Sequence, residues 1–442
     1  FLKEVPMLKP LIERDTSELF ELKNQVNIEI HTASFRTIRG YALSVNTPIP
    51  TPSGFKKMGD LEIGDEVFDE KGKKIKITNI FDRMPNKAFR FTFSDGTTID
   101  ADAEHQWVTW DHRSRRRYYM HGLIKDQGVV PDDWPVWSSQ KDMESKGIGR
   151  PISKFGATQL SSLDIANSMY VESWTGANLP NHAIPNCLPL EIGPRDLLID
   201  PYLFGLWLGD GTKKTGVIAT NFANGDSEWI QSSFEEKGYK LVRRNEYSFS
   251  IYGLQTELRT IGALKNKNIP DKYLWASRSQ RLALLQGFMD SDGYVNPDRK
   301  QVSLTATRKE HAEAVAFLAR SLGQKPTLKK YKRTEGCPGK THDYSVSWTS
   351  TINPFRLPRK VATWEGNKIS KLQNVSMRTI VSCEEIDPSP MRCITVDSSN
   401  AMYLCGKSLI PTHNTVAAAL FDEMAFWRSE DAANPDREIL AA

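Results

Sequence analysis

The sequence lacks long apolar runs, and cysteine is scarce. It has no run of about 18 apolar residues, the minimum for a membrane-spanning helix, and its first residues do not follow the pattern of a signal peptide. We therefore expect no membrane partner and a cytoplasmic location. The five cysteines are scattered, odd in number and never spaced as Cys-x-x-Cys. This disfavours both a disulfide framework and a zinc site.

Charge and composition are otherwise ordinary. The net charge of +4 is too small to indicate nucleic-acid binding by itself, so any DNA-binding surface must be local. With 39% hydrophobic and 25% charged residues, the chain can bury normal cores, and its 442 residues predict several domains.

A short stretch near the C-terminus carries unusual chemistry: Thr412-His413-Asn414-Thr415. The Asn414 side-chain amide can attack its own backbone carbonyl, form a succinimide and cut the chain after Asn414. His413 is placed to move the protons, and the Thr415 hydroxyl can hold an acyl group when the cut occurs. Such a stretch alone is also typical of a polar turn. The flanking sequence therefore decides between a reactive junction and a turn.

The two ends of the chain form one continuous motif when they are joined. Residues 26–35 alternate like a strand and lead into Arg36–Tyr41, whereas Thr415 begins an apolar run that ends in Asp422-Glu423. Together they look like a Walker-B-like strand with its two carboxylates. The 373 residues from Ala42 to Asn414 interrupt this motif, which indicates an insertion within a host protein.

Short alternating strands with Gly and Asp turns follow Ala42, at Ile75–Ile80 and Phe89–Phe93. The strands that would close this all-β unit lie far away in the sequence, near Met377–Val381, Arg392–Val396 and Met402–Leu404. The material between them begins with a basic run, Arg113–Arg117. This run is either a solvated loop or a contact to the DNA backbone.

The middle of the chain contains an internal repeat. Leu203–Gly211 and Leu285–Gly293 each join apolar and small residues to a final Asp-Gly. Small residues would let two such helices pack closely and bring Asp210 and Asp292 together. Two carboxylates at helix C-termini are unfavourable unless cations are present, and paired carboxylates can hold the metal ions that cleave phosphodiesters. The alternative is a pair of ordinary core helices.

These repeats resemble the LAGLIDADG homing endonucleases, and the framing segments resemble the splicing domain of inteins. The first resemblance implies Mg²⁺ bound by Asp210 and Asp292, double-stranded DNA as partner and Lys267, in Lys267-Asn-Ile-Pro270, as a catalytic lysine. Ala319–Gly323 is similar to the family's later helix-end motif. No second catalytic lysine is evident in the sequence.

The splicing segments depart from the common intein pattern. Most inteins begin with Cys or Ser, but the first residue by motif position is Ala42. Ser44 is the nearest hydroxyl, although starting there would place the following Thr-Pro too early. Trp107, Cys393 and Thr412 together resemble the signature of class 3 inteins, which lack the usual first nucleophile. We expect Trp107 to pack beside Cys393.

In the implied route, Cys393 attacks the Tyr41 carbonyl and His105 assists the departing Ala42 amine. The acyl group then passes to Thr415 and Asn414 cyclises with help from His413. Splicing by this route needs no cofactor and acts on the flanking segments, the exteins, in cis. Asp102 stands where these proteins usually have threonine, and Asn400–Tyr403 where they usually have His-Asn-Phe. Cys405 lies outside every motif, so we expect it to be structural.

The predicted fold is multidomain. An all-β HINT (Hedgehog/intein) splicing domain is interrupted by an α+β LAGLIDADG domain with a pseudo-two-fold repeat, in a monomer. The predicted divisions are 1–41 (N-extein), 42–165 with an insertion from about 111, 195–360 (endonuclease), 370–414 and 415–442 (C-extein). The extein motif resembles a phage terminase large subunit, which implies a bacterial host cytoplasm.

Two other functional interpretations remain. The splicing domain could be a vestigial scaffold for an active endonuclease. Hedgehog-type autoprocessing without ligation is the third, and the presence of both junction motifs argues against it.

Overall fold

The structure is a computed structural model. It describes residues 41–120, 157–173, 175–220, 222, 225–332, 342–368 and 373–414, together with three short strands before residue 30. The chain divides into two compact units, Phe1–Arg39 with Thr415–Ala442, and Gly40–Asn414. Each unit is described by itself below.

In the smaller unit, β1 (Ile12–Asp15), β2 (Leu19–Leu22) and β3 (Asn27–Glu29) form an antiparallel sheet in that order. β3 lies within the alternating stretch predicted as a strand. Thr415, Asp422 and Glu423 lie outside the described residues.

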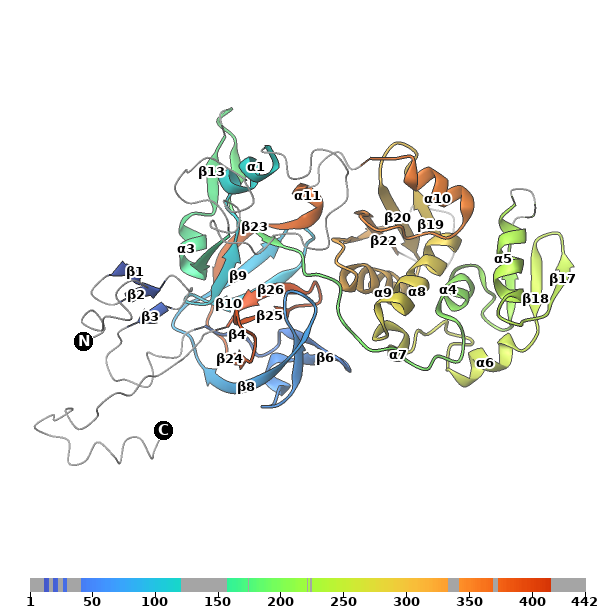
Figure 1. Cartoon of the computed structure of the whole chain (residues 1–442), viewed down its shortest axis with the longest axis horizontal. Helices are drawn as coiled ribbons and strands as arrows, with labels where there is room; N and C mark the ends of the chain where they lie inside the picture. The colour runs from blue at the N-terminus through green and yellow to red at the C-terminus, as the bar shows by residue number, and fades with distance from the viewer. Residues whose placement is uncertain are drawn as a thin grey trace, which may run out of the picture. The chain divides into compact units, whose positions relative to one another are not determined.

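An eight-stranded antiparallel sheet organises the first part of the larger unit (Figure 1). The predicted closing strands near Met377 and Arg392 are confirmed, because β23 and β24 lie within this sheet. Early and late segments of the chain therefore alternate across one sheet. In spatial order its strands are β15 (Ala183–Pro185), β23 (Met377–Ile386), β9 (Ala88–Phe93), β10 (Thr98–Asp102), β4 (Leu43–Ser44), β24 (Met391–Val396), β8 (Lys74–Arg83) and β7 (Glu66–Phe68).

Alternation along β9 shows why this sheet forms. Phe89, Phe91 and Phe93 are buried, whereas Arg90 between them is exposed and pairs with Asp100. Smaller elements complete the β unit: β5 (Pro48–Thr51) with β6 (Gly54–Lys57), β11 (Gln106–Thr109) with β12 (Thr158–Ser161), β13 (Tyr170–Glu172) with β14 (Asn178–Pro180), β25 (Met402–Cys405) with β26 (Ile410–His413), and helices η2 (Met58–Asp60), α1 (His112–Met120), α3 (Ser162–Asn167) and α11 (Gln373–Ser376).

The basic run Arg113–Arg117 lies in helix α1, so the loop interpretation is wrong. The Arg115 guanidinium donates hydrogen bonds to the carbonyls of Trp110 and Asn181, both at 2.7 Å. This arginine therefore stabilises the domain's own backbone. No helix among the described residues is long and apolar enough to cross a membrane.

The chain enters and leaves its α+β part at neighbouring points. The backbone N–H of Asn186 donates to the Ser376 carbonyl at 2.9 Å, and its side chain donates to the Val375 carbonyl at 2.7 Å. About 190 residues therefore leave the β unit and return to the same place.

This inserted part repeats one pattern. α4 (Pro201–Asp210) leads into the sheet of β16 (Val217–Ala219), β18 (Ser248–Ile251) and β17 (Leu241–Asn245), whereas α8 (Arg278–Ser291) leads into a four-stranded sheet. The predicted repeat is confirmed at this level. The second sheet contains β19 (Gly293–Val295), β20 (Gln301–Ala306), β22 (His342–Thr349) and β21 (Thr327–Lys332), and the other helices are α5 (Asp226–Glu235), α6 (Leu254–Thr260), α7 (Asp271–Leu274), α9 (Lys309–Ser321) and α10 (Pro358–Glu365).

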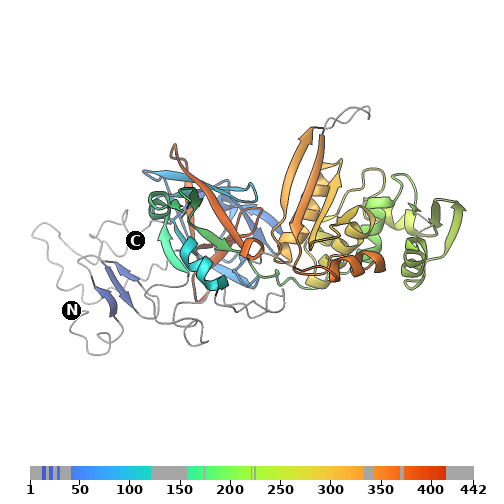
Figure 2. The same ribbon diagram turned by 90° about the horizontal axis from the view of Figure 1, so that it is seen from above.

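Helix α9 packs against β20 and β22 (Figure 2). It ends at Ser321, and Gly323 follows with a φ of 80°. The predicted helix end at Ala319–Gly323 is thus confirmed.

Two glycines allow α4 and α8 to cross closely. A Cβ on Gly205 would lie 2.5 Å from the Leu284 carbonyl oxygen, and one on Gly287 would lie 2.1 Å from the Tyr202 carbonyl oxygen. Both distances are too short for any side chain, and both obstacles are backbone atoms. The crossing that brings the two helix ends together therefore depends on glycine.

We expect Gly287→Ala to lower the free energy of unfolding of the α+β part by about 1–3 kcal/mol, because the backbones must separate. The gain in helix propensity, about 1 kcal/mol, offsets only part of this cost. Gly193→Ala is the matched control, since a Cβ there meets nothing within 4 Å. Urea unfolding of the two variants checks the prediction, and equal midpoints would contradict it.

Candidate functional site

Cys393 lies beside the first residue of the insertion. In the antiparallel pairing of β24 with β4, Met391 faces Ser44 and Arg392 faces Leu43. The register therefore carries Cys393 to the position opposite Ala42. Both side chains are buried in one small cluster, and Cys393 is 4% exposed. A thiol is thus available next to the Tyr41–Ala42 peptide bond.

Asp102 contacts the same junction through its backbone. Its N–H donates to the Ala42 carbonyl at 2.9 Å, and its buried carboxylate forms an ion pair with Arg83 at 3.1 Å. Burial raises the pKa of Asp102 to about 6, despite the opposing effect of Arg83. The carboxylate at this position therefore forms an ion pair with Arg83, and the backbone N–H forms the hydrogen bond to Ala42.

His105 connects the two ends of the insertion. Its Nε2 hydrogen-bonds the Thr412 hydroxyl at 2.5 Å. The Tyr41 backbone favours protonation of the same imidazole. His105 is fully buried, which lowers its pKa to about 3; the Tyr41 backbone opposes this shift and His413 adds to it. The imidazole is therefore neutral near pH 7 and can exchange protons with groups at either junction.

Trp107 packs beside His105, with ring centroids 4.9 Å apart. Its indole N–H donates to the Ser162 hydroxyl at 3.1 Å, and its ring also packs against Phe91. Trp107 and Cys393 belong to different buried clusters. Packing of Trp107 against Cys393 stays a prediction, and the described contacts of the indole are with the aromatic side chains of β9 and the imidazole of His105. The structure supports an effect of Trp107 on His105.

Asn414 is held at both ends of its side chain. In the amide orientation that satisfies the hydrogen bonds, its nitrogen donates to the Ala401 carbonyl at 2.8 Å and its oxygen accepts from the Val396 N–H at 2.7 Å. Its backbone N–H also donates to the Ala401 carbonyl, at 2.7 Å. Asn414 is 1% exposed. An immobilised amide excluded from water is the requirement for attack on a neighbouring carbonyl.

His413 precedes this amide on β26. Burial lowers the pKa of His413 to about 4, while the Asn414 backbone opposes the shift. Its imidazole is therefore neutral near pH 7 and can accept a proton. Cys405, in the partner strand β25, is fully buried, and burial raises its thiol pKa above the ordinary range. This agrees with the expected structural role of Cys405.

The predicted acids of the repeat lie at the ends of its two helices. α4 ends at Asp210, and Asp292 is the C-cap of α8. A Cβ on Gly209 would lie 3.2 Å from Asp292 Oδ2, so the second acid reaches the end of the first helix. Burial, then the charge of Asp292, raises the pKa of Asp210 to about 6; burial also raises that of Asp292. The structure therefore brings these two residues together.

Lys267 closes the end of α4. Its ammonium donates to the carbonyls of Leu208 and Gly209, both at 2.8 Å. Burial lowers the pKa of Lys267 to about 8, whereas Asp292 and Asp210 oppose that shift. This lysine therefore lies within the electrostatic field of both acids, as predicted.

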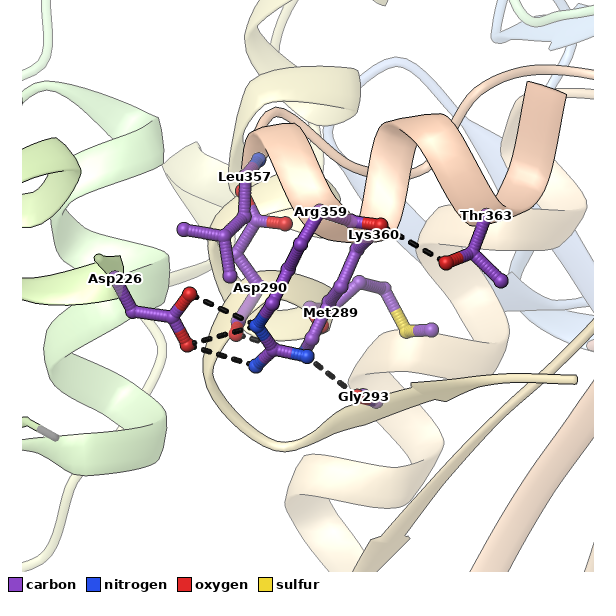
Figure 3. Close-up of polar contacts among 8 residues, drawn as sticks. All are labelled: Asp226, Met289, Asp290, Gly293, Leu357, Arg359, Lys360 and Thr363. Carbon is purple, nitrogen blue, oxygen red and sulfur yellow. Dashed lines mark hydrogen bonds and ion pairs between the residues drawn. The ribbon is translucent and has the colours of Figure 1, made fainter. Parts of the chain in front are cut away.

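Lys360 lies at the end of α8 as Lys267 lies at the end of α4, a correspondence that the sequence does not reveal. Its ammonium donates to the carbonyls of Met289, Asp290 and Gly293 at 2.7–2.8 Å, and so closes the end of α8 (Figure 3). Burial lowers its pKa to about 8. The sequence around Lys360 does not repeat the Lys-x-Ile-Pro pattern, because Lys360 follows its proline by two residues. Leu357-Pro358, just before Lys360, is similar only to the Ile-Pro end of that pattern.

Other acids near this centre have structural partners. The Asp290 carboxylate accepts from the Tyr202 hydroxyl at 2.8 Å and from the N–H groups of Arg356 and Leu357 at 3.0 Å. Asp226, at the start of α5, forms a two-pronged ion pair with Arg359 of α10, with a shortest distance of 2.7 Å (Figure 3). These contacts hold the chain that carries Lys360 against both repeats.

Asp210 and Asp292 fit a Mg²⁺ site, because Mg²⁺ is commonly held by one or two carboxylates, with waters and substrate phosphates as the other ligands. The raised pKa of Asp210 beside Asp292 indicates a repulsion that a divalent cation would relieve. Within the described ranges no group of three or more His, Cys, Asp or Glu side chains has metal-binding geometry. Substrate would therefore have to supply further ligands.

Comparison with known proteins gives one family match and several relatives. Residues 279–357 match the model of the LAGLIDADG-like domain, so the chain contains such a domain. Over 381 residues the chain is 30% identical to the replicative DNA helicase DnaB of Mycobacterium intracellulare, a match that covers 85% of this chain and 59% of the relative. The chain thus spans about three fifths of the length of that relative.

Two solved structures are also similar to parts of the chain. The MchDnaB-1 intein is 42% identical over 15% of this chain and 53% of its own, with a TM-score of 0.15. Mesophilic variants of the homing endonuclease I-DmoI are 16% identical over 38% of this chain and 97% of their own, with a TM-score of 0.28.

Proposed function

We propose that residues 42–414 are a self-splicing intein of class 3 with an embedded Mg²⁺-dependent homing endonuclease. One observation carries the splicing proposal: β24 pairs with β4 so that Cys393 lies opposite Ala42, the first residue of the 373-residue segment, in one buried cluster. The sequence similarity to the MchDnaB-1 intein supports the same conclusion.

The first step is attack of the Cys393 thiolate on the Tyr41 carbonyl, which forms a thioester and releases the Ala42 amine. Cysteine suits this role because a thiol is more readily ionised than an alcohol near pH 7. His105 donates or relays the proton that the departing amine needs. The Asp102 N–H fixes the Ala42 carbonyl on the other side of the bond.

The remaining steps end at Asn414. The acyl group passes from Cys393 sulfur to the Thr415 hydroxyl, and the thiol regains its proton. The Asn414 side-chain nitrogen then attacks its own backbone carbonyl, and His413 accepts its proton and returns it to the departing Thr415 amine. The Asn414–Thr415 bond breaks, and residues 42–414 leave with a C-terminal succinimide. An acyl shift from oxygen to nitrogen leaves a Tyr41–Thr415 peptide bond.

The proposed endonuclease activity depends on the close packing of α4 and α8, which brings their C-terminal ends together. Bound Mg²⁺ would activate water and stabilise the leaving oxygen of the phosphodiester. Asp210 and Asp292 would hold the ion, and Lys267 would stabilise developing negative charge beside them. The substrate is double-stranded DNA at the host-gene site that lacks the insertion, cut by a monomer with two related halves.

The two flanking segments, when joined, indicate the kind of host protein. The Walker-B-like motif formed by joining residues 26–41 to 415–423 supports a terminase large subunit, in phage or prophage, spliced in the bacterial cytoplasm. DnaB of Mycobacterium intracellulare, named as a replicative helicase, is an alternative kind of host. Sequencing the flanking gene decides between them, since a terminase and a helicase differ outside this motif.

The splicing route predicts a different outcome for each of three proteins. The parental chain should yield a ligated product of residues 1–41 and 415–442 together with free 42–414. Cys393→Ala should abolish ligation, because no acyl group can be transferred, whereas Asn414→Ala should block release of 42–414 and keep a branched thioester or ester, which has the mass of the unreacted chain and loses residues 1–41 to hydroxylamine. Intact-mass spectrometry checks all three. A full-length mass alone in every case would leave a splicing domain that is only a scaffold for the endonuclease.

The lowered pKa of His413 predicts the pH dependence of Asn414 cyclisation. Because the pKa lies near 4, the imidazole remains neutral as pH falls from 8 to 5 and is protonated only as pH approaches 4. Cleavage after Asn414 in the Cys393→Ala background should therefore be nearly constant from pH 8 to about 5. A fall centred near the ordinary histidine pKa of about 6.5 would contradict a buried base.

Asp210→Asn should abolish cutting of DNA that carries the uninterrupted host site. Lys267→Met should slow it about 100-fold or more, because a buried positive charge beside the reacting phosphate is lost. Lys272→Met, which removes an exposed lysine nearby, serves as the control. Removal of Mg²⁺ by EDTA should stop cutting and leave splicing unchanged. Cutting that persists in Asp210→Asn would refute the assignment.

A further inference from the structure

Glu70 is a buried carboxylate that neither centre uses directly. It lies in the turn between β7 and β8 and is fully buried, and burial raises its pKa. The Asn400 side-chain nitrogen donates to Glu70 Oε1 at 2.7 Å, whereas Oε2 is buried without a hydrogen-bond partner. An acid in such surroundings is costly, so its retention requires a compensating contact. Asn400 provides that contact.

Asn400 precedes the residue that holds the reacting amide. The Ala401 carbonyl accepts both the backbone N–H and the side-chain nitrogen of Asn414, at 2.7 and 2.8 Å. Ala401 has a φ of 54°, a left-handed conformation that a residue other than glycine seldom adopts. Such a conformation persists only where the surroundings hold it. The carbonyl that orients Asn414 therefore depends on how its loop is anchored.

We propose that Glu70 is a positioning residue for Asn414 cyclisation and acts through Asn400 and the Ala401 carbonyl. The inference rests on the proposed splicing function. It adds Glu70, from the turn between β7 and β8, to the residues that act on Asn414. Glu70 does not touch Asn414. It fixes the loop whose carbonyl determines the direction from which the Asn414 nitrogen approaches.

The turn that carries Glu70 is itself fixed by the chain leading into the α+β part. The Leu188 N–H donates to the Glu70 carbonyl at 2.9 Å, and the Glu191 N–H donates to the Gly72 carbonyl at 2.7 Å. A Cβ on Gly72 would lie 2.2 Å from the Pro189 carbonyl oxygen, so the two segments are in direct contact. The orientation of Glu70 is therefore set by backbone contacts on both sides.

The test separates the two junctions. Release of residues 415–442 from the Cys393→Ala chain reports Asn414 cyclisation alone. Release of residues 1–41 by hydroxylamine from the Asn414→Ala chain reports thioester formation alone. Each reaction is followed by intact mass with Glu70→Ala, Glu70→Gln, Glu70→Asp and Asn400→Ala added.

We expect Glu70→Ala to slow cyclisation by about 10- to 100-fold, the effect of a small misplacement of a reacting group. Thioester formation should change by less than about twofold, because Cys393 and Ala42 are held by β4 and β24. Glu70→Gln should recover most of the rate, since its amide oxygen can still accept from Asn400. Glu70→Asp is too short to reach and should resemble Glu70→Ala.

Asn400→Ala combined with Glu70→Ala should be no slower than Asn400→Ala alone, because Asn400→Ala already breaks the contact with Glu70 together with the hydrogen bond that Asn400 Oδ1 accepts from the Met402 N–H. Lys71→Ala, an exposed neighbour in the same turn, is the matched control and should retain the parental rates. Equal slowing at both junctions, or unchanged cyclisation in Glu70→Ala, would overturn the role of Glu70. Parental chains that react at neither junction would overturn the splicing function itself.

Discussion

The antiparallel pairing of β4 with β24 is the constraint on which the rest of the molecule depends. It joins a strand that begins at residue 43 to one that begins at residue 391, and it sets Cys393 against Ala42. β26 then lies beside β11, so that Thr412 reaches His105. Neither contact is local in sequence. Both arise because the hydrophobic faces of short strands are buried together, and the register follows from that burial.

Burial also determines the protonation states that the chemistry needs. His105 and His413 remain neutral near pH 7 because water is excluded from them, so each imidazole has one N–H that can donate and one nitrogen that can accept a proton, where free histidine would be partly charged. At the ends of α4 and α8 the same effect disfavours charge on Asp210. Burial therefore keeps the two histidines neutral, and it makes a bound cation favourable beside Asp210.

The sequence identifies the residues whose chemistry is intrinsic to their motifs. Asp210, Asp292 and Lys267 follow from the repeat and the Lys-x-Ile-Pro pattern, and the closing strands follow from alternation. The sequence does not predict Lys360, because this lysine follows its proline instead of preceding it as in Lys-x-Ile-Pro. It does not predict Glu70 either, because the proposed role of Glu70 comes from one long-range hydrogen bond to Asn400. Motif spacing fixes which residues belong to a site, while packing determines which of them touch.

The meeting of Asn186 with Val375 and Ser376 has an evolutionary consequence. A segment whose two ends are held together by hydrogen bonds closes no new loop in the surrounding sheet, so its removal leaves β15 and β23 paired and needs only a short turn between them. The eight-stranded sheet can therefore persist with or without its α+β passenger. A lineage that lost the α+β part through a single deletion could keep this strand pairing, but Phe68, Leu404 and Leu409 would lose the buried cluster that they share with Trp275 and Phe317 and would need a substitute covering.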